Sequence, residues 1–352
     1  MKSLSEKNAR ILRCCQYRAD EPLKSLAKDL DMNLSTVHYH LSALKRAGTI
    51  KCKVPFINPY PLGYSRIAVY FSLATDTPQA RKDFLSQLIA TEGVAWVESV
   101  SGDFEYGTAF ITQHPHRAVQ RLSQISAQTG AYLIHKKVSL RQQFEFFGSR
   151  HLANMPIPDS TIGYGESDVR FDADAIDLRI LSALGNTSYE SVKSLQKHVN
   201  LPFATLKRRI ERLENAGVIA GYFYRFDLQS LGYKVFTLLI QSRGDVEKLG
   251  KNLKLYSQTQ HAVTAISKGF GEWDYELKVE LKNSEDISRI ISELYVRLGT
   301  EVSSIRTLQN FRYLKYTGFP ALQGSSSQSK KVNGEFLFVP GIVTEQIPEL
   351  RR

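Results

Sequence analysis

The sequence repeats itself at a constant spacing. Arg-Ile-Leu at residues 10–12 returns at residues 179–181, and Leu-Gly-Tyr at residues 62–64 returns at residues 231–233. The spacing holds without a gap over about 95 residues and is far longer than the periods of solenoid repeats. The chain is therefore expected to hold two copies of one large unit, so any fold proposed for it must be built twice.

Composition excludes several classes of protein. The 352 residues are enough for about two to four domains, and the hydrophobic and charged fractions, 42% and 23%, are those of a globular protein. No apolar run approaches the length of a membrane-spanning helix, and residues 1–10 lack the apolar segment of a signal peptide. Cys14, Cys15 and Cys52 are too few for a disulfide framework and fit a reducing compartment. We expect a cytoplasmic protein with no membrane partner and no cofactor.

The net charge of +11 suits either a polyanionic partner or solubility alone, and the total does not separate the two. The distribution of the charge is more informative. Residues 1–56 contain eleven Lys or Arg against five Asp or Glu, and residues 171–226 contain eight against six. Both segments are basic, the first more strongly, and each opens one copy.

Residues 1–56 predict a winged helix-turn-helix. Apolar residues at helical spacing predict a first helix around Ile11, a second over residues 23–30, and a third from Ser35, whose hydroxyl is expected to cap it. A three-residue turn joins the second and third helices, Gly48 ends the third, and residues 50–54 alternate as a strand, the wing. The second copy, residues 171–226, predicts helices over 177–184 and 192–199, a third helix from Ala204 or Thr205 to Gly217, and a wing over 219–224.

The outer face of each third helix is rich in hydrogen-bond donors, which base edges and phosphates in the major groove require. We expect double-stranded DNA to contact the two third helices and the first wing, at Ser35, Thr36, His38, Tyr39, His40, Lys45, Arg46, Lys51, Lys53, Thr205, Lys207, Arg208, Arg209 and Arg212. The alternative is that these basic faces are merely solvated. His38 and His40 have no third ligand nearby in the sequence, so no metal site is predicted.

The rest of each copy predicts a small α/β domain. Residues 57–148 and 227–318 each follow the order strand, helix, strand, strand, helix, strand, the ferredoxin-like βαββαβ arrangement, so the fold class is α+β. Residues 149–170 contain Pro156, Pro158, Gly163 and Gly165, which oppose regular structure and indicate a linker. Residues 319–352 form a tail with a serine-rich run, and no role is predicted for it.

The turn between the second and third strands of this domain carries the most specific motif. It reads Ser-Gly-Asp-Phe-Glu-Tyr over residues 101–106 and Gly-Glu-Trp-Asp-Tyr over residues 271–275, and Asn58-Pro59 leads out of the first wing. With the winged helix-turn-helix before it, the chain resembles the Lrp/AsnC (feast/famine) transcription regulators over nearly its whole length. The resemblance implies a sequence-specific DNA-binding regulator whose α/β domain dimerises sheet to sheet and binds a small effector, commonly an amino acid.

The candidate effector site is this turn. Its residues are Gly102, Asp103 and Phe104 in the first copy and Gly271, Glu272 and Trp273 in the second. The glycine amides suit a carboxylate, and the acidic side chains suit an ammonium group. The alternative is a tight turn in which Gly-Asp is simply good turn chemistry and the aromatic residues belong to the core.

Members of the family carry one unit per chain and assemble as dimers or multiples, whereas this chain carries two units. We infer an internal pseudo-dimer with the two sheets packed face to face, and further homo-oligomers.

Two other functions stay open. Siroheme decarboxylases resemble these regulators in fold, but such an enzyme needs His, Arg and Tyr around a polycarboxylate tetrapyrrole, and here the strands beside the turn carry Glu105, Asp274 and Glu276. No catalytic residue is predicted, because no nucleophile or phosphate-binding motif is found. The other alternative is an effector-binding adaptor whose second DNA-binding domain has decayed, since residues 171–226 are only weakly basic.

Overall fold

The computed structural model describes residues 4–155, 161–165, 167, 169–186 and 191–320. The chain divides into two compact units, and each combines segments of both copies. Of the described residues, unit 1 contains 4–56, 142–155, 161–165 and 220–309, and unit 2 contains 57–141, 167, 169–186, 191–219 and 310–320. Each unit therefore joins the winged helix-turn-helix of one copy to the α/β domain of the other.

Unit 1 begins with a three-helix domain. Its elements are α1 (Glu6–Cys15), α2 (Leu23–Leu30), α3 (Leu34–Arg46) and β1 (Ile50–Ile57), which pairs with β7 (Ile219–Phe226) in a two-stranded sheet. Leu12, Leu30 and Leu41 meet in one core because each helix turns its apolar stripe inward. Tyr224 and Phe226 of β7 belong to the same core. The first winged domain thus takes part of its core from the second copy.

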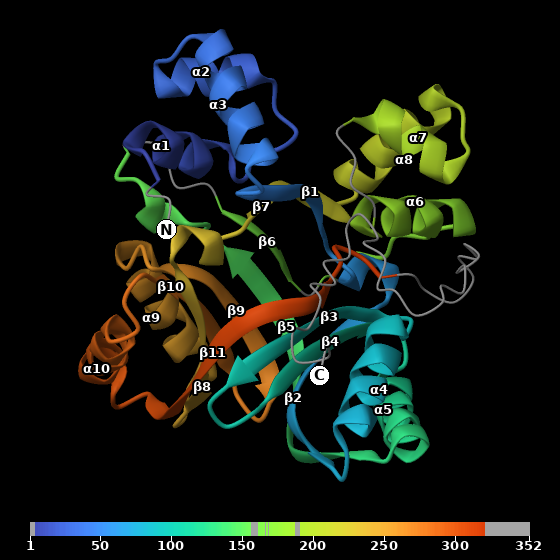
Figure 1. Ribbon diagram of the computed structural model, residues 1–352, viewed down its shortest axis with the longest axis vertical. Helices are drawn as coiled ribbons and strands as arrows, with labels where there is room; N and C mark the ends of the chain where they lie inside the picture. Colours follow the sequence, from blue (N-terminus) through green and yellow to red (C-terminus); the bar gives the residue numbers. More distant parts are fainter. Residues whose placement is uncertain (1–3, 156–160, 166, 168, 187–190, 321–352) are drawn as a thin grey trace. The chain divides into compact units, whose positions relative to one another are not determined.

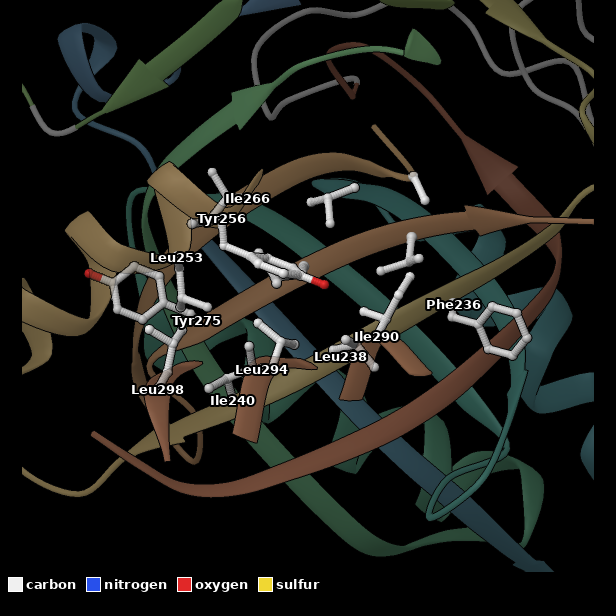
Figure 2. Packing of buried hydrophobic residues seen from close by; sticks show 14 of the residues in the cluster. Phe236, Leu238, Ile240, Leu253, Tyr256, Ile266, Tyr275, Ile290, Leu294 and Leu298 are labelled. Atoms are coloured by element: carbon white, nitrogen blue, oxygen red, sulfur yellow. The ribbon is translucent and has the colours of Figure 1, made fainter. Parts of the chain in front are cut away.

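The α/β domain of unit 1 is an antiparallel sheet with two helices on one face (Figure 1). Its elements are η3 (Gln229–Leu231), β8 (Lys234–Ser242), α9 (Val246–Thr259), β9 (Val263–Gly271), β10 (Tyr275–Leu281), α10 (Asp286–Leu298) and β11 (Val302–Tyr316). Strand β10 pairs with both β8 and β9. Figure 2 shows Leu253 of α9 and Ile290 and Leu294 of α10 gathered beside Leu238 and Ile240 of β8. Burial of these side chains fixes both helices on the sheet.

Unit 2 follows the same plan with the copies exchanged. Its α/β elements are η1 (Tyr60–Leu62), β2 (Ser65–Thr75), α4 (Pro78–Ala90), β3 (Val94–Ser101), β4 (Tyr106–Thr112), α5 (Pro115–Thr129) and β5 (Ala131–Phe146), and its helical elements are α6 (Ala175–Asn186), α7 (Val192–Val199) and α8 (Phe203–Asn215). Strand β4 pairs antiparallel with β2 and β3, and β2 also pairs with β5. Phe71 and Phe84 lie in its core together with Leu314, which comes from β11.

The last strand of each α/β domain continues beyond its own unit. The end of β5 lies beside β9 in unit 1, and the end of β11 lies beside β3 in unit 2. Just after each of these strands, equivalent residues of the two copies make an equivalent backbone hydrogen bond. Gly148 N donates to Thr264 O at 3.2 Å in unit 1, and Thr317 N donates to Ala95 O at 2.8 Å in unit 2. Equivalent residues therefore make the exchange twice.

The predicted helices and strands are present, with corrections at two places. Both third helices are followed by glycines with positive φ, Gly48 and Gly217, as expected. Ser35 does not cap α3, because the helix begins one residue earlier and Asn33 occupies the N-cap position. Asn33 has an extended backbone there, and its side chain makes no capping hydrogen bond.

The segment between the copies is more regular than predicted. Strand β6 (Ile162–Gly165) pairs antiparallel with the end of β5, and η2 (Arg150–Leu152) precedes it. A four-residue strand is stable only beside a partner, and the long β5 supplies one that the linker sequence alone does not signal. Pro156, Pro158 and residues 321–352, which include most of the predicted tail, lie outside the described residues. In the part of the chain that the structure describes, no helix is long and apolar enough to cross a membrane.

Buried polar groups attach η2 to the α/β domain of unit 1. The Arg150 guanidinium donates to Ser257 O and, at 3.1 Å, to Val263 O. His151 Nε2 lies 3.6 Å from Glu280 Oε2 of β10. Burial raises the pKa of Glu280 to about 7 and lowers the pKa of His151 to about 4. Between these values both side chains are uncharged, so the contact is made without burying a charge.

Glu280 should make the stability of the protein depend on pH. Since its folded pKa lies above that of an unfolded glutamate, its contribution is full below pH 4.5 and is lost as the pH rises through 7. The difference in unfolding free energy between wild type and Glu280→Gln should therefore shift by about 3 kcal/mol between pH 4.5 and 8, to the disadvantage of wild type at the higher pH. Urea unfolding at the two pH values measures it, and a difference independent of pH contradicts the assignment.

Candidate nucleic-acid interface

The third helix of the first copy, α3, turns its donor-rich face outward. Val37, Leu41 and Leu44 are buried, so the residues between them point away from the core. Of the predicted contacts, Ser35, His38 and Arg46 are exposed, and Tyr39 is 64% exposed. These four side chains are open to a partner.

The other predicted contacts of the first copy have neighbours inside unit 1. Thr36, His40 and Lys45 are half-buried. His40 Nδ1 lies 2.8 Å from Asn8 Oδ1, and Lys45 Nζ lies 5.4 Å from the ring centroid of Tyr224. These contacts orient the side chains rather than leaving them mobile.

The two wing lysines are held by the second copy. Lys51 Nζ forms an ion pair with Asp227 at 2.8 Å, and Lys53 Nζ lies 4.3 Å from the ring centroid of Tyr222 on β7. Lys51 remains about one-third exposed, so the pair is weak and phosphate oxygens are able to compete for the ammonium group.

In the second copy, the predicted DNA contacts on α8 fall into two groups, those that are open to solvent and those that pair with acids. Lys207 and Arg208 are exposed, and Thr205 is half-buried. Lys207 Nζ lies 3.6 Å from Glu211 Oε1, one helical turn along, a spacing at which exposed pairs contribute little. These two side chains contribute to the outward basic surface of α8 together with Arg212, which is 51% exposed.

The other two predicted contacts on α8, Arg209 and Arg212, have acidic partners within unit 2. Arg209 pairs with both Asp174 and Asp177 at 2.8 Å, and Arg212 approaches Asp177 at 3.5 Å and covers the Phe171 ring at 4.5 Å. Hydrogen bonds to the two acids raise the pKa of Arg209, while the Asp177 amide and Arg209 lower the pKa of Asp174. Asp177 is fully buried and Arg209 is 19% exposed. Asp174 and Asp177 together form an acidic clamp around these arginines. The sequence did not predict the clamp, because Asp177 belongs to α6 and Asp174 precedes that helix.

The candidate effector turns have the backbone that glycine permits. Gly102 and Gly271 have φ values of 115° and 142°, and Asp103 and Glu272 are exposed. Phe104 and Trp273 are buried, with Phe104 stacked on Tyr70 at 5.9 Å. Both aromatic rings therefore pack in the interior, while the glycine and the acid of each turn face solvent.

Two further acids at the turns were not among the predicted site residues. Glu105 accepts a hydrogen bond from Leu73 N at 2.9 Å, and Asp274 accepts one from Ser242 N at 2.7 Å. The two pairs are equivalent at the repeat spacing. The signal in the sequence was an acid at the same place in both copies, and its role is to hold the turn against the preceding strand.

A cavity of about 550 Å³ opens close to the second turn, within unit 1. Its lining includes Lys251, Lys268, Tyr275 and Gly250, and its volume suits a small molecule. The equivalent of Gly250 in the first copy is Arg81, which fills its own surroundings by bonding to Glu105 and Tyr106. None of the six candidate effector residues lines this cavity.

Comparison with known proteins agrees with the helix-turn-helix geometry. Residues 174–220 match the winged helix-turn-helix DNA-binding family. An HTH-type transcriptional regulator of Pyrococcus horikoshii is 30% identical over 127 residues, which cover 34% of this chain and 79% of the relative. An HTH-type transcriptional regulator of Pyrococcus furiosus is 28% identical over 130 residues, covering 37% of this chain and 86% of the relative. The chain belongs to the Lrp/AsnC family of HTH-type transcriptional regulators. As a member of the Lrp/AsnC family it is a DNA-binding regulator, as the two helix-turn-helix patterns predicted.

The fold of this Lrp/AsnC regulator also matches a solved enzyme. The siroheme decarboxylase NirDL has a TM-score of 0.55 and 12% identity, over 91% of this chain and 95% of that one. At this identity the match shows a shared fold alone. Within the described ranges of this regulator, no group of three or more His, Cys, Asp or Glu side chains is placed to hold a metal ion.

Breaking the acidic clamp should destabilise unit 2. Asp177→Ala leaves Arg209 without its buried partner, and we expect a loss of about 2–3 kcal/mol, below the cost for a fully buried pair because Arg209 reaches solvent. Asp172→Ala, which removes an exposed carboxylate nearby, is the control. Urea unfolding of both variants makes the comparison, and equal stabilities would show that the pair contributes nothing.

Proposed function

We propose that this regulator binds its DNA site through the outward faces of α3 and α8, with help from the first wing. The observation that supports it is the exposure of donor side chains on both third helices, above all Tyr39 and Arg208. An α-helix fits the major groove, where such donors meet base edges and phosphates. The proposed contacts are Ser35, Thr36, His38, Tyr39, His40, Lys45, Arg46, Lys51, Lys53, Thr205, Lys207 and Arg208.

Arg209 and Arg212 contribute their positive charge to the proposed interface, but not direct contacts to bases. Their ion pairs with Asp174 and Asp177 compete with phosphates. The positive potential of both side chains still reaches DNA, but we propose no direct base contact for either.

We propose that a small effector, such as an amino acid, modulates DNA binding from the turn at Gly102, Asp103 and Phe104 or its equivalent at Gly271, Glu272 and Trp273. The nearby cavity supports a ligand in this region of unit 1, because it is large enough for a small molecule and combines lysines with an aromatic wall. Isothermal titration with amino acids tests this, and the absence of heat for every one of them would remove the proposal.

We propose that the two copies form an internal pseudo-dimer in the cytoplasm and that such chains assemble further. Each unit combines segments of both copies, which supports the pseudo-dimer. Light scattering across a range of concentrations tests further assembly, and a single chain at every concentration would rule it out.

We propose that the chain is not an enzyme. The turns carry the acids Glu105 and Asp274, whose carboxylates repel the negative charges of a polycarboxylate. A spectral titration with an iron tetrapyrrole tests this, because tight binding would favour a decarboxylase instead.

DNA binding should depend on both third helices. We expect duplex from the upstream region of the protein's own gene to bind at least about a thousandfold more tightly than scrambled duplex. Log affinity should fall linearly with log salt, by about 0.9 per phosphate contact. The paired variants His38→Ala/Tyr39→Ala and Lys207→Ala/Arg208→Ala should each lower affinity.

A charge-matched control for the second pair is Lys136→Ala/Arg289→Ala, which removes two exposed positive charges from β5 and α10. If Lys207→Ala/Arg208→Ala binds like this control, the second DNA-binding domain has decayed and the adaptor alternative gains. If neither helix variant differs from wild type on specific duplex, the proposed interface is wrong.

A further inference from the structure

Both third helices begin with a large apolar side chain exposed to solvent. Leu34, the first residue of α3, is 50% exposed, and Phe203, the first residue of α8, is 46% exposed. The two positions are equivalent at the repeat spacing. Neither residue belongs to the cores of its domain, which are built from positions further along each helix. Single exposed apolar side chains are common on protein surfaces, but the recurrence of one at the same position in both copies points to a partner surface.

The place of these side chains identifies that surface. In a helix-turn-helix the N-terminal residues of the third helix face the base edges of the major groove. The C5-methyl of thymine is the apolar group that the groove presents there. A leucine or phenylalanine at this position therefore matches thymine and has no partner on the phosphates.

The neighbouring positions differ in chemistry between the two copies. Tyr39 in α3 corresponds to Arg208 in α8, and His38 corresponds to Lys207; all four side chains are exposed. Arginine is able to donate two parallel hydrogen bonds to O6 and N7 of guanine, whereas tyrosine offers a single hydroxyl. The two helices therefore present different reading surfaces.

The acidic clamp sharpens this difference. His40 corresponds to Arg209, and the carboxylates of Asp174 and Asp177 hold Arg209 in place. With Arg209 engaged, Arg208 is left as the arginine that α8 extends outward near its N-terminal end.

We propose that the chain recognises an asymmetric DNA site, in which each half contains a thymine read by Leu34 or Phe203 and only one half contains a guanine read by Arg208. This rests on the proposed DNA-binding function of α3 and α8. Two identical chains favour palindromic sites because their reading helices are the same. Here the two reading helices differ and belong to one chain. Nothing in the structure therefore requires the two halves of the DNA site to have the same sequence.

The test begins with selection of the preferred duplex from a random pool by the full-length protein. We expect a non-palindromic site. In wild type, replacing the contacted thymine of either half by uracil removes only the methyl group and should weaken binding about fourfold. Leu34→Ala should abolish this effect in one half and Phe203→Ala in the other.

Arg208→Ala should relax the guanine preference in one half by about 5- to 150-fold and leave the other half unchanged. Tyr39→Arg should create a guanine preference in the other half. Leu255→Ala, Phe270→Ala and Arg289→Ala, which alter exposed residues of the same types outside the third helices, should bind like wild type. All the altered side chains are exposed, and thermal melts establish that each variant is folded.

The outcomes separate the inference from the function on which it rests. A palindromic preferred site, or uracil bound as well as thymine at every position, overturns the inference while the DNA-binding function stands. A selection that recovers no preferred sequence overturns the proposed sequence-specific function itself.

Discussion

The length of two strands, β5 and β11, governs how this chain is built. Each begins in the α/β domain of its own copy, and its end lies in the unit that contains the other copy's α/β domain. The unpaired edge of a sheet is satisfied by the strand that reaches it. The winged helix-turn-helix of each copy lies in the unit that contains the other copy's α/β domain. The matching hydrogen bonds from Gly148 to Thr264 and from Thr317 to Ala95 give both exchanges the same geometry. Duplication therefore produced two mixed units rather than two separate copies.

The same arrangement allowed the two DNA-binding domains to diverge. Each keeps the buried stripe that holds its third helix, because Leu41 and Ile210 fill equivalent places in their cores. The outer faces are free of that constraint. The first copy keeps polar aromatic side chains on α3, and the second places arginines on α8 and then restrains one of them with Asp174 and Asp177. A single chain thus carries two reading surfaces of different chemistry on one shared framework.

Local pattern was enough to predict the elements, and the long-range contacts were not predictable from it. The spacing of Val37, Leu41 and Leu44 fixes a helix and its buried face, so α3 and the order of the βαββαβ domains followed from the sequence. The engagement of Arg209 did not, because its acidic partners precede it by more than thirty residues and approach only after packing. Strand β6 was missed for a similar reason, since its regularity comes from β5. Pairing across copies, as between β1 and β7, is likewise a long-range contact that local pattern does not encode.

Zero-length carbodiimide crosslinking followed by peptide mass spectrometry tests the exchange most directly. Lys51 of the first copy and Asp227 of the second lie 2.8 Å apart in unit 1, and Glu145 and Lys254 lie 2.8 Å apart in the same unit. We expect both crosslinks within a single chain, at a yield independent of protein concentration. If instead these peptides were joined only between chains, or Lys51 were crosslinked only to acids of residues 1–148, the winged helix-turn-helix of the first copy would not be built on the second copy, which contradicts the exchange.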